Sequence, residues 1–309
     1  MAKILVTGGA GYVGCVLVPK LLDLNHEVTV LDNLFYHQSV LLDQFRKNLK
    51  FIKADVRKRE EIEPYFKDQD FIVHLAAIVG FPACSAQPEI AKSTNVEATK
   101  LINELRGDTK IIYPSSGSIY GKLEATCTEE SPVNPLTLYS QTKLDAEMEI
   151  RRKGNCVILR PATAFGLSPR MRLDLLPNDF TFQAVRMGSL VVYQGGAKRT
   201  FIHVSDFANA IIFAINHFEQ MQNEVYNLGG DDMNLTKQEL AKKIKEVHDY
   251  YLHFADIGSD PDERDYEVSY AKLKRVGFTP KIKMEEGIKE LISGYNMINL
   301  RNPYSNYRF

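Results

Sequence analysis

The sequence of 309 residues is poor in the features that mark several special classes of protein. Its four cysteines are scattered without a C-x-x-C pair, and its seven histidines show no ligand spacing, so we predict reduced thiols and no structural metal. No apolar stretch approaches the ~20 residues of a membrane span. A formal net charge of −1 gives no argument for binding nucleic acid or a membrane surface. An apolar run begins directly after Met1-Ala2 and leaves no room for a signal peptide, so we expect a cytoplasmic protein.

The most informative feature that is present is a glycine-rich turn near the N-terminus. The apolar run at 4–6 is typical of a buried strand, and residues 15–24 predict a helix with an apolar face. Glycines between them permit a tight turn and a close approach of a pyrophosphate to the backbone, while the helix directs free N–H groups at the phosphates. We therefore predict a dinucleotide site that includes Gly8, Gly11, Tyr12, Val13 and Gly14.

The end of the second predicted strand indicates which dinucleotide is bound. Residues 27–31 form that strand, and Asp32 ends it where an acidic side chain meets the ribose hydroxyls of adenosine. A carboxylate repels the 2′-phosphate of NADP, and Asn33 rather than an arginine stands beside it. Asp32 and Asn33 thus favour NAD as the cofactor.

Strand and helix patterns alternate through the first half of the chain. Further strands are predicted at 49–53, 70–75, 110–113 and 156–159, and helices at 89–106 and 135–152. The alternation predicts an α/β fold, a doubly wound parallel (Rossmann-type) sheet with a smaller mixed α/β substrate region. We expect an NAD-binding domain over 1–166 and a mainly substrate-binding region over 167–309, from which segments such as 204–229 return to the first domain.

After residue 166 the pattern loosens. A basic loop with two prolines is expected over 168–180, followed by helices at 181–187, 204–218 and 236–248 and strands at 190–193 and 225–228. The tail from residue 299 onward has no periodicity, and we expect it on the surface.

Polar or small residues follow several of the predicted strands, where open parallel sheets keep their ligand crevice. Asp55 either faces that crevice or caps the next helix, and the two roles are compatible. Leu75, Ala76 and Ala77 let the backbone lie flat against a cofactor, although a tightly packed loop would explain them as well. His74 lies within its strand and fits a core histidine better than a catalyst.

The predicted helix at 135–152 carries a phenol and an ammonium on adjacent turns of one face, at Tyr139 and Lys143. A phenol with the usual pKa of about 10 is a poor base at neutral pH, and lowering that pKa by ~3 units takes ~4 kcal/mol. One cation ~4 Å away supplies about that much at an effective dielectric of ~20. A chance pair on a solvated helix is the alternative, but the neighbouring dinucleotide site favours Tyr139 as a general base poised by Lys143.

Together these motifs resemble those of the extended short-chain dehydrogenases that act on nucleotide-linked sugars. The resemblance covers nearly the whole chain and includes residues 7–14, 32, 55, 75–77, 115–121, 139, 143, 200–206 and 226–230. It implies that Ser116 hydrogen-bonds the reacting sugar oxygen, that Tyr139 is the base, and that Lys143 also holds the nicotinamide ribose. It implies that Asp55 contacts the adenine, and it assigns further cofactor contacts to Val56, Leu75, Ala76, Ala77 and Asn95. It also implies that Asn178, Arg199 and Arg264 contact the diphosphate of the sugar nucleotide.

The sequence also departs from the pattern of that family. The family's 4,6-dehydratases carry an Asp-Glu pair directly after the active-site hydroxyl residue, where this chain has Gly117 and Ser118, so the acid and base for losing water are missing. Thr163 stands where many relatives have a sugar-contacting asparagine. Cys84 is expected near the sugar as a small packed thiol, because no His or Lys beside it in sequence would activate it.

The resemblance implies NAD-dependent oxidation at C4 of a nucleotide-diphosphate sugar, with two outcomes for the keto intermediate. The commoner outcome in the family is return of the hydride to the other face, so a sugar-nucleotide 4-epimerase is favoured. The alternative is a C4 dehydrogenase that releases its 4-keto product, like enzymes that modify GDP-linked manno-heptoses for bacterial surface polysaccharides, to which residues 168–180 look similar.

Two further classes of protein are less favoured by the sequence. A Rossmann-like redox sensor would be expected to lose the Tyr-Lys pair, which this chain keeps. A dehydrogenase for steroid- or flavonol-like alcohols would not need Arg170, Arg172, Arg199 and Arg264, which suit a diphosphate.

The resemblance also implies a homodimer or a dimer of dimers. In such enzymes the helix that carries Tyr139 and the long helix before the fifth strand pack against a partner. The outward residues Leu138, Leu144 and Met148 are apolar enough to be buried in that way.

Overall fold

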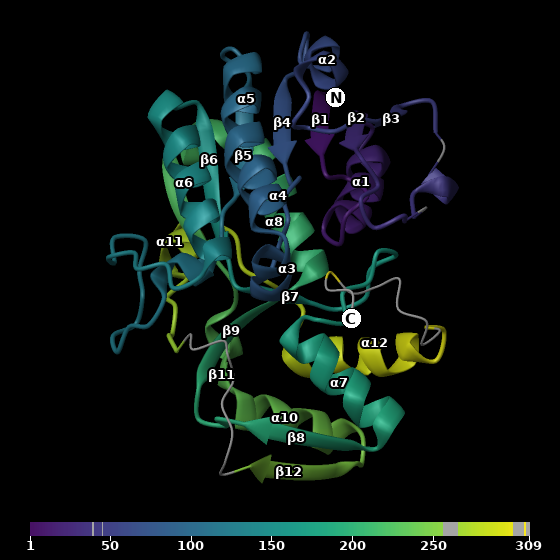
Figure 1. The fold of residues 1–309 in the computed structure, drawn as a ribbon, viewed down its shortest axis with the longest axis vertical. Helices are drawn as coiled ribbons and strands as arrows, with labels where there is room; N and C mark the ends of the chain where they lie inside the picture. The colour runs from purple at the N-terminus through teal and green to yellow at the C-terminus, as the bar shows by residue number, and fades with distance from the viewer. Residues whose placement is uncertain (39, 45, 256–264, 299–305, 307–309) are drawn as a thin grey trace.

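A seven-stranded parallel sheet forms the centre of the structure, a computed structural model that describes residues 1–38, 40–44, 46–255, 265–298 and 306 (Figure 1). Its strands are β1 (Lys3–Thr7), β2 (Glu27–Asp32), β3 (Leu49–Lys53), β4 (Phe71–His74), β5 (Lys110–Pro114), β6 (Cys156–Pro161) and β10 (Glu224–Leu228). The order is β10-β6-β5-β4-β1-β2-β3, with every pair parallel. The order reverses between β1 and β4, so a ligand crevice is expected beyond the carboxyl ends of these strands. The predicted doubly wound sheet is confirmed.

Helices cover both faces of this sheet because its strands are apolar on both sides. The helices α1 (Gly14–Asp23) and α8 (Val204–Asn216) cover one face, and α5 (Ala98–Leu105) and α6 (Leu138–Lys153) cover the other. Ile4 packs in one core with Leu17 and Ile211, whereas the next residue, Leu5, packs in the opposite core with Ile102. This alternation is the period of two that a strand imposes on its side chains.

A smaller mixed region lies below the large sheet in Figure 1. It contains a three-stranded sheet of β7 (Thr163–Phe165), β9 (Lys198–His203) and β11 (Asn234–Thr236), and a parallel pair of β8 (Ser189–Tyr193) and β12 (Tyr251–Ala255). Its helices are α7 (Leu176–Met187), α10 (Lys237–Val247) and α12 (Met284–Tyr295), which share an apolar core. The segment between β9 and β11 in the chain, which contains α8 and β10, returns to the large sheet. There α8 packs against α1, and β10 pairs with β6. The domain division at 166/167 stays a prediction.

Several predicted elements differ in extent from the observed ones. The helix expected over 89–106 consists of α4 (Pro88–Lys92), a π-helical turn (Ser93–Glu97) and α5. Helix α6 begins three residues late, because the Thr137 hydroxyl caps its first turn by accepting from the backbone N–H of Ser140. The basic loop is shorter than expected, because α7 begins within it. Remaining short helices are α2 (Arg59–Ile62), α3 (Phe81–Ala86), α9 (Phe218–Met221) and α11 (Ala271–Arg275).

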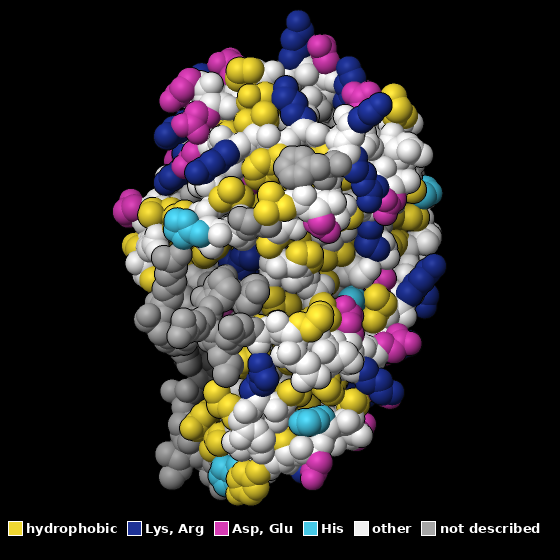
Figure 2. Space-filling view, turned by 90° about the vertical axis from the view of Figure 1, so that its right-hand side faces the viewer, with side chains coloured by type: hydrophobic (Ala, Val, Ile, Leu, Met, Phe, Trp, Pro, Cys, Tyr) yellow, Lys and Arg dark blue, Asp and Glu magenta, His cyan; other side chains and the backbone are white. Residues whose placement is uncertain are grey.

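The surface carries charges of both signs. Lys and Arg side chains are interspersed with Asp and Glu over the face shown in Figure 2. None of the helices in the described part of the chain combines the length and the apolar character that a membrane span needs. Within the same residues, no three His, Cys, Asp or Glu side chains are grouped as metal ligands would be.

Candidate active site

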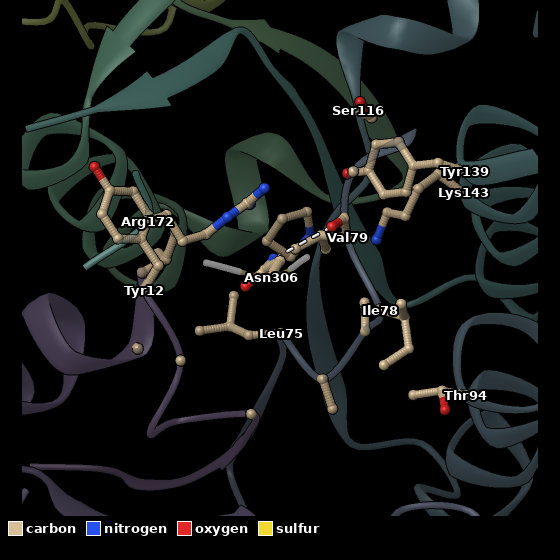
Figure 3. A pocket seen from close by; sticks show the side chains of 18 of the residues that line it. Tyr12, Leu75, Ile78, Val79, Thr94, Ser116, Tyr139, Lys143, Arg172 and Asn306 are labelled. Atoms are coloured by element: carbon tan, nitrogen blue, oxygen red, sulfur yellow. Dashed lines mark hydrogen bonds between the residues drawn. The ribbon is translucent and has the colours of Figure 1, made fainter. Parts of the chain in front are cut away.

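A cavity of about 280 Å³ opens where the carboxyl ends of the central strands meet the smaller region (Figure 3). Most of the residues predicted for the cofactor and the reaction line it: Gly8, Gly11, Tyr12, Val13, Gly14, Asp32, Asn33, Val56, Leu75, Ala76, Ala77, Ser116, Tyr139 and Lys143. Asp55, Asn95, Asn178 and Arg199 are not among the lining residues, and Arg264 lies outside the described residues. The roles of all these residues stay predictions.

The turn between β1 and α1 has the backbone that a pyrophosphate requires. Gly8 has φ +70°, and a Cβ there would lie 2.6 Å from the backbone nitrogen of Ala76, so only glycine fits. A Cβ on Gly14 would lie 2.4 Å from the carbonyl oxygen of Gly9. Helix α1 starts without a capping side chain, and the N–H groups of Cys15 and Val16 donate to the carbonyl oxygens of Gly11 and Val13, at 2.9 and 3.1 Å, so the turn is held by its own backbone with the positive end of the helix toward the cavity. The turn therefore fits the diphosphate of NAD.

Asp32 is fixed at the end of β2 with its carboxylate in the cavity wall. Its two oxygens accept hydrogen bonds from the backbone N–H groups of Ala10, at 3.0 Å, and Leu34, at 2.8 Å. Burial raises the pKa of Asp32, and the two N–H donors oppose that rise. The remaining acceptor capacity of the carboxylate suits ribose hydroxyls.

Arg57, which was not predicted from the sequence, lines the cavity close to the end where Asp32 lies. Arg57 donates through Nε to both oxygens of Asp55, at 2.9 and 3.1 Å, and through Nη2 at 2.5 Å. The hydrogen bond from Arg57 is the main reason that the pKa of Asp55 is lowered. Asp55 thus neutralises a cation at the adenosine end, and its contact with adenine stays a prediction. The i,i+2 spacing of Asp55 and Arg57 was the available sequence signal.

Asn95 forms hydrogen bonds with the loop after β4 and does not itself line the cavity. Its side chain accepts from the N–H of Ile78 at 2.8 Å and donates to the carbonyl of the same residue at 2.9 Å. It also donates to the hydroxyl of Thr142 on α6 at 3.0 Å. The π-helical turn places this fully buried amide between the loop and the catalytic helix. Asn95 therefore holds a cavity wall in place, and direct contact with the cofactor stays a prediction.

Tyr139 and Lys143 enter the cavity from the first two turns of α6 (Figure 3). The Lys143 ammonium lies 4.1 Å from the ring centroid of Tyr113, and the residue is only 4% exposed. Burial lowers the pKa of Lys143 to about 7, against the opposing effect of Glu147. Lys143 therefore titrates near neutral pH, and below that it supplies the positive charge that a tyrosine base needs.

Three serines that line the cavity follow β5, namely Ser115, Ser116 and Ser118. The hydroxyls of Ser116 and Ser118 lie 2.8 Å apart, and the backbone N–H of Ser118 donates to the Ser116 oxygen at 3.2 Å. Both residues line the cavity, whereas Gly117 does not. A Cβ at Gly117 would lie 3.2 Å from the carbonyl oxygen of Pro161, so a carboxylate side chain would be crowded there. At the two positions where the resemblance implies an Asp-Glu pair in dehydratases, the site thus offers one hydroxyl, that of Ser118, and no carboxyl group.

Two residues predicted to contact the substrate diphosphate are buried outside the cavity. Asn178 accepts from the N–H of Gly166 at 3.0 Å and donates to the Arg172 carbonyl at 2.8 Å, so it fixes the loop between β7 and α7. Arg199 lies in β9 and is 3% exposed. Thr163, at the start of β7, does line the cavity.

The smaller region and the tail contribute further lining residues: Arg170, in the predicted basic loop, and Asn306, which was not predicted from the sequence. Arg170 lies 4.5 Å above the ring of Tyr36 and donates to the side-chain oxygen of Asn306 at 2.7 Å. Asn306 in turn donates to the Val79 carbonyl at 3.2 Å (Figure 3). Asn306 is 8% exposed, so the expectation of a surface position for the whole tail is wrong at this residue. The aperiodic tail carried no sequence signal for this contact.

Two side chains predicted to be structural are confirmed as such. The Cys84 thiol donates to the Ile78 carbonyl at 3.3 Å, is fully buried, and has its pKa raised to about 12 by that burial. The ring nitrogens of His74 contact the hydroxyls of Thr7 and Thr99 at 2.7 and 2.9 Å. Burial lowers the pKa of His74 to about 3, so it stays neutral.

Comparison with known proteins adds sequence and structural relatives. The family described as "NAD dependent epimerase/dehydratase family" matches residues 4–229. The low-salt glycan biosynthesis protein Agl12 of Haloferax volcanii is 30% identical over 94% of this chain and 98% of its own length. UDP-glucose 4-epimerase 1 of Oryza sativa is 28% identical over 98% and 96%. The structure of UDP-glucose 4-epimerase from Thermotoga maritima with UDP-glucose, 26% identical, covers 96% of this chain and 99% of its own with a TM-score of 0.84.

Proposed function

Because this chain belongs to the NAD-dependent epimerase/dehydratase family, it is an NAD-dependent enzyme, and we propose that it inverts C4 of a nucleotide-diphosphate sugar. The observation that carries the proposal is the meeting of Tyr139, Lys143 and Ser116 in the cavity onto which the glycine turn opens. Relatives named UDP-glucose 4-epimerase that align over nearly their whole length support the choice of reaction.

The roles proposed for the side chains follow from their chemistry. Tyr139 takes the proton from the C4 hydroxyl and later returns it, while Ser116 hydrogen-bonds the same oxygen. Lys143 keeps a positive charge beside the phenolate when it is protonated. When bound, NAD⁺ would supply the acceptor for the hydride from C4 and the donor for its return. The glycine turn, Asp32 and the wall at 75–77 are the residues that would hold the cofactor.

Loss of water from the oxidised sugar is not part of the proposal. Ser118 and Gly117 supply no carboxyl group to protonate the leaving C6 oxygen or to take the C5 proton. The keto intermediate therefore either turns and is reduced on its other face, or leaves as a 4-keto product. The second fate, on a GDP-linked manno-heptose for bacterial surface polysaccharide, is the alternative that the experiment has to separate.

The test is to incubate the NAD-loaded protein with UDP-, GDP-, CDP- and dTDP-sugars and to follow the products by NMR. Interconversion of C4 epimers is expected. Accumulation of a 4-keto sugar with NADH would indicate the dehydrogenase, and bound NAD without turnover of any sugar would favour a redox sensor.

Tyr139→Phe should bind NAD normally but lose at least about 10²-fold in turnover. Tyr251→Phe, at a 68% exposed position on β12, is the matched control, and near-wild-type turnover of Tyr139→Phe would contradict the mechanism.

The working state proposed for the enzyme is a homodimer, or a dimer of dimers, in the cytoplasm. The four free cysteines are all buried, which suits a reducing compartment. Met148 on α6 is 61% exposed, an apolar side chain on the face expected to meet the partner.

A further inference from the structure

Arg172 is the charged side chain that faces Tyr139 across the cavity. Figure 3 shows it extending from the loop between β7 and α7 toward the side where Tyr139 and Ser116 lie. It lines the cavity, its side chain is only 12% exposed, and Tyr139 is one of the charges that act on it. A group at this position meets the sugar near the carbon that reacts.

Asp174 holds this guanidinium from outside the cavity. Arg172 donates through Nε to one carboxylate oxygen at 3.2 Å and through Nη2 to the other at 2.5 Å. Asp174 is not a lining residue, and the backbone of Asn306 adds a hydrogen bond to its carboxylate. In the described part of the chain, the Nη1 group of Arg172 has no hydrogen-bond partner, so its donors are left for a ligand.

The arginine is also fixed by its backbone and by the wall opposite. Asn178 donates to its carbonyl at 2.8 Å. Gly80 has φ +96°, and a Cβ there would lie 3.3 Å from Nη2, so glycine keeps the space in which the guanidinium lies. A donor pre-positioned in this way loses little entropy when a ligand binds.

The charge balance of the pair indicates what it recognises. A buried arginine that binds a carboxylate or phosphate of the ligand needs an uncompensated positive charge. A protein carboxylate beside it would repel the ligand's anion. The sequence indicated that Arg172 suits a diphosphate, but the pair of Arg172 with Asp174 is neutral overall, and the N–H groups of Nη1 suit uncharged hydroxyls. We propose, on the basis of the proposed function, that Arg172 reads sugar hydroxyls next to the reacting carbon and that Asp174, as its positioning residue, restricts the substrate to neutral sugars and disfavours uronic acids.

The experiment measures binding to the NADH-loaded protein by calorimetry, with two pairs of probes that differ only at C6: UDP-glucose with UDP-glucuronate, and GDP-mannose with GDP-mannuronate. Within a pair the nucleotide contribution cancels. In the pair that binds more tightly, the wild type should bind the neutral sugar at least about tenfold more tightly than the uronate. Asp174→Asn should shift that ratio at least about tenfold toward the uronate, because it leaves Arg172 with an uncompensated charge. Arg172→Gln should weaken the neutral sugar about tenfold or more without changing NADH binding.

Glu285→Gln is the matched control, since this exposed acid lies on α12 outside the cavity and forms an ion pair with Lys289. It should leave the ratio within about twofold, because its charge does not face the ligand. Melting temperature and NADH binding report whether each variant is folded, and the two variants of the pair give independent evidence. A wild-type preference for the uronate, or an unchanged ratio in Asp174→Asn, overturns the inference and leaves the proposed function intact. If none of the four sugars binds, the inference fails, and the NMR assay with CDP- and dTDP-sugars decides the proposed function separately.

Discussion

At the scale of single residues, Lys143 is a buried cation whose cost to the fold depends on pH. Burial lowers its pKa from 10.5 to about 7. Between those values the unfolded chain binds more protons than the folded one, so this residue makes stability rise with pH from about 7 to 10.5. Below pH 7 the full penalty applies, which is at most about 5 kcal/mol from the size of the shift.

We therefore expect Lys143→Met to be more stable than the wild type at pH 6–7 by ~2–5 kcal/mol, with the advantage vanishing toward pH 10.5. Urea unfolding of the cofactor-free protein at several pH values measures the difference. The variant should lose activity although it gains stability. Parallel stability curves for the two proteins across that range would show that Lys143 is not the buried titrating group described here.

The Asp55–Arg57 pair leads to a second prediction at this scale. Arg57 lines the cavity with its charge neutralised, and Asn33 also hydrogen-bonds Asp55, so the pair lies at the ribose end of the cofactor site. Asp55→Asn frees the cation to receive a 2′-phosphate. The preference for NADH over NADPH should narrow by about tenfold, the equivalent of ~1.4 kcal/mol.

Fluorescence titration with the two reduced cofactors measures this preference. Adding Arg57→Met to Asp55→Asn should restore the preference for NADH, since the cation is then removed. A ratio that does not change in Asp55→Asn would mean that Arg57 does not reach the 2′ position and that Asp32 alone excludes NADP.

At the scale of elements, the π-helical turn acts on the site through Asn95. Asn95→Ala would leave the buried N–H of Ile78 without its partner, and the Ile78 carbonyl with only the weak thiol donor of Cys84. An unsatisfied buried group costs about 1–3 kcal/mol, so we expect a loss of ~1–3 kcal/mol in the free energy of unfolding. Because Ile78 lines the cavity, the affinity for NADH should fall as well.

Thermal or urea unfolding and NADH titration of the same preparation test both parts. Lys92→Ala, an exposed change on α4 just before the turn, is the control and should behave as the wild type. Weaker NADH binding at unchanged stability would instead indicate direct contact between Asn95 and the cofactor.

The sheet and the cofactor half of the site were predictable because their signals are local. A glycine turn between an apolar strand and a helix, or Tyr139 four residues before Lys143, is complete within one stretch of sequence. The pairing of β12 with β8 and the position of Asn306 depend on segments that meet only after folding. Their sequences are short or aperiodic, so composition alone does not locate them.

At the scale of the whole molecule, the catalytic helix is tied to the segment that returns from the smaller region. Glu147 on α6 forms a buried ion pair with Arg160 of β6, with Nη2 and Oε1 2.7 Å apart. Arg160 donates to the hydroxyl of Tyr120 at 2.9 Å, and that hydroxyl donates to Asn227 of β10 at 2.7 Å. This chain of contacts runs from α6 through β6 to β10, so the helix of Tyr139 and Lys143 is tied to the strand that returns to the large sheet.

The opposite side of α6 carries the proposed dimer contact. Met148 is 61% exposed there, while Leu138 and Leu144 are half-buried. A two-fold axis at this face would place Met148 near its own copy, so a charge at 148 would be brought close to an identical charge. Met148→Lys should therefore convert a dimer of twice 35.1 kDa into a monomer in light scattering at micromolar concentration. Met187→Lys, at a 67% exposed position on α7, should remain dimeric. A wild-type protein of monomeric mass, or equal effects of the two substitutions, would refute this interface.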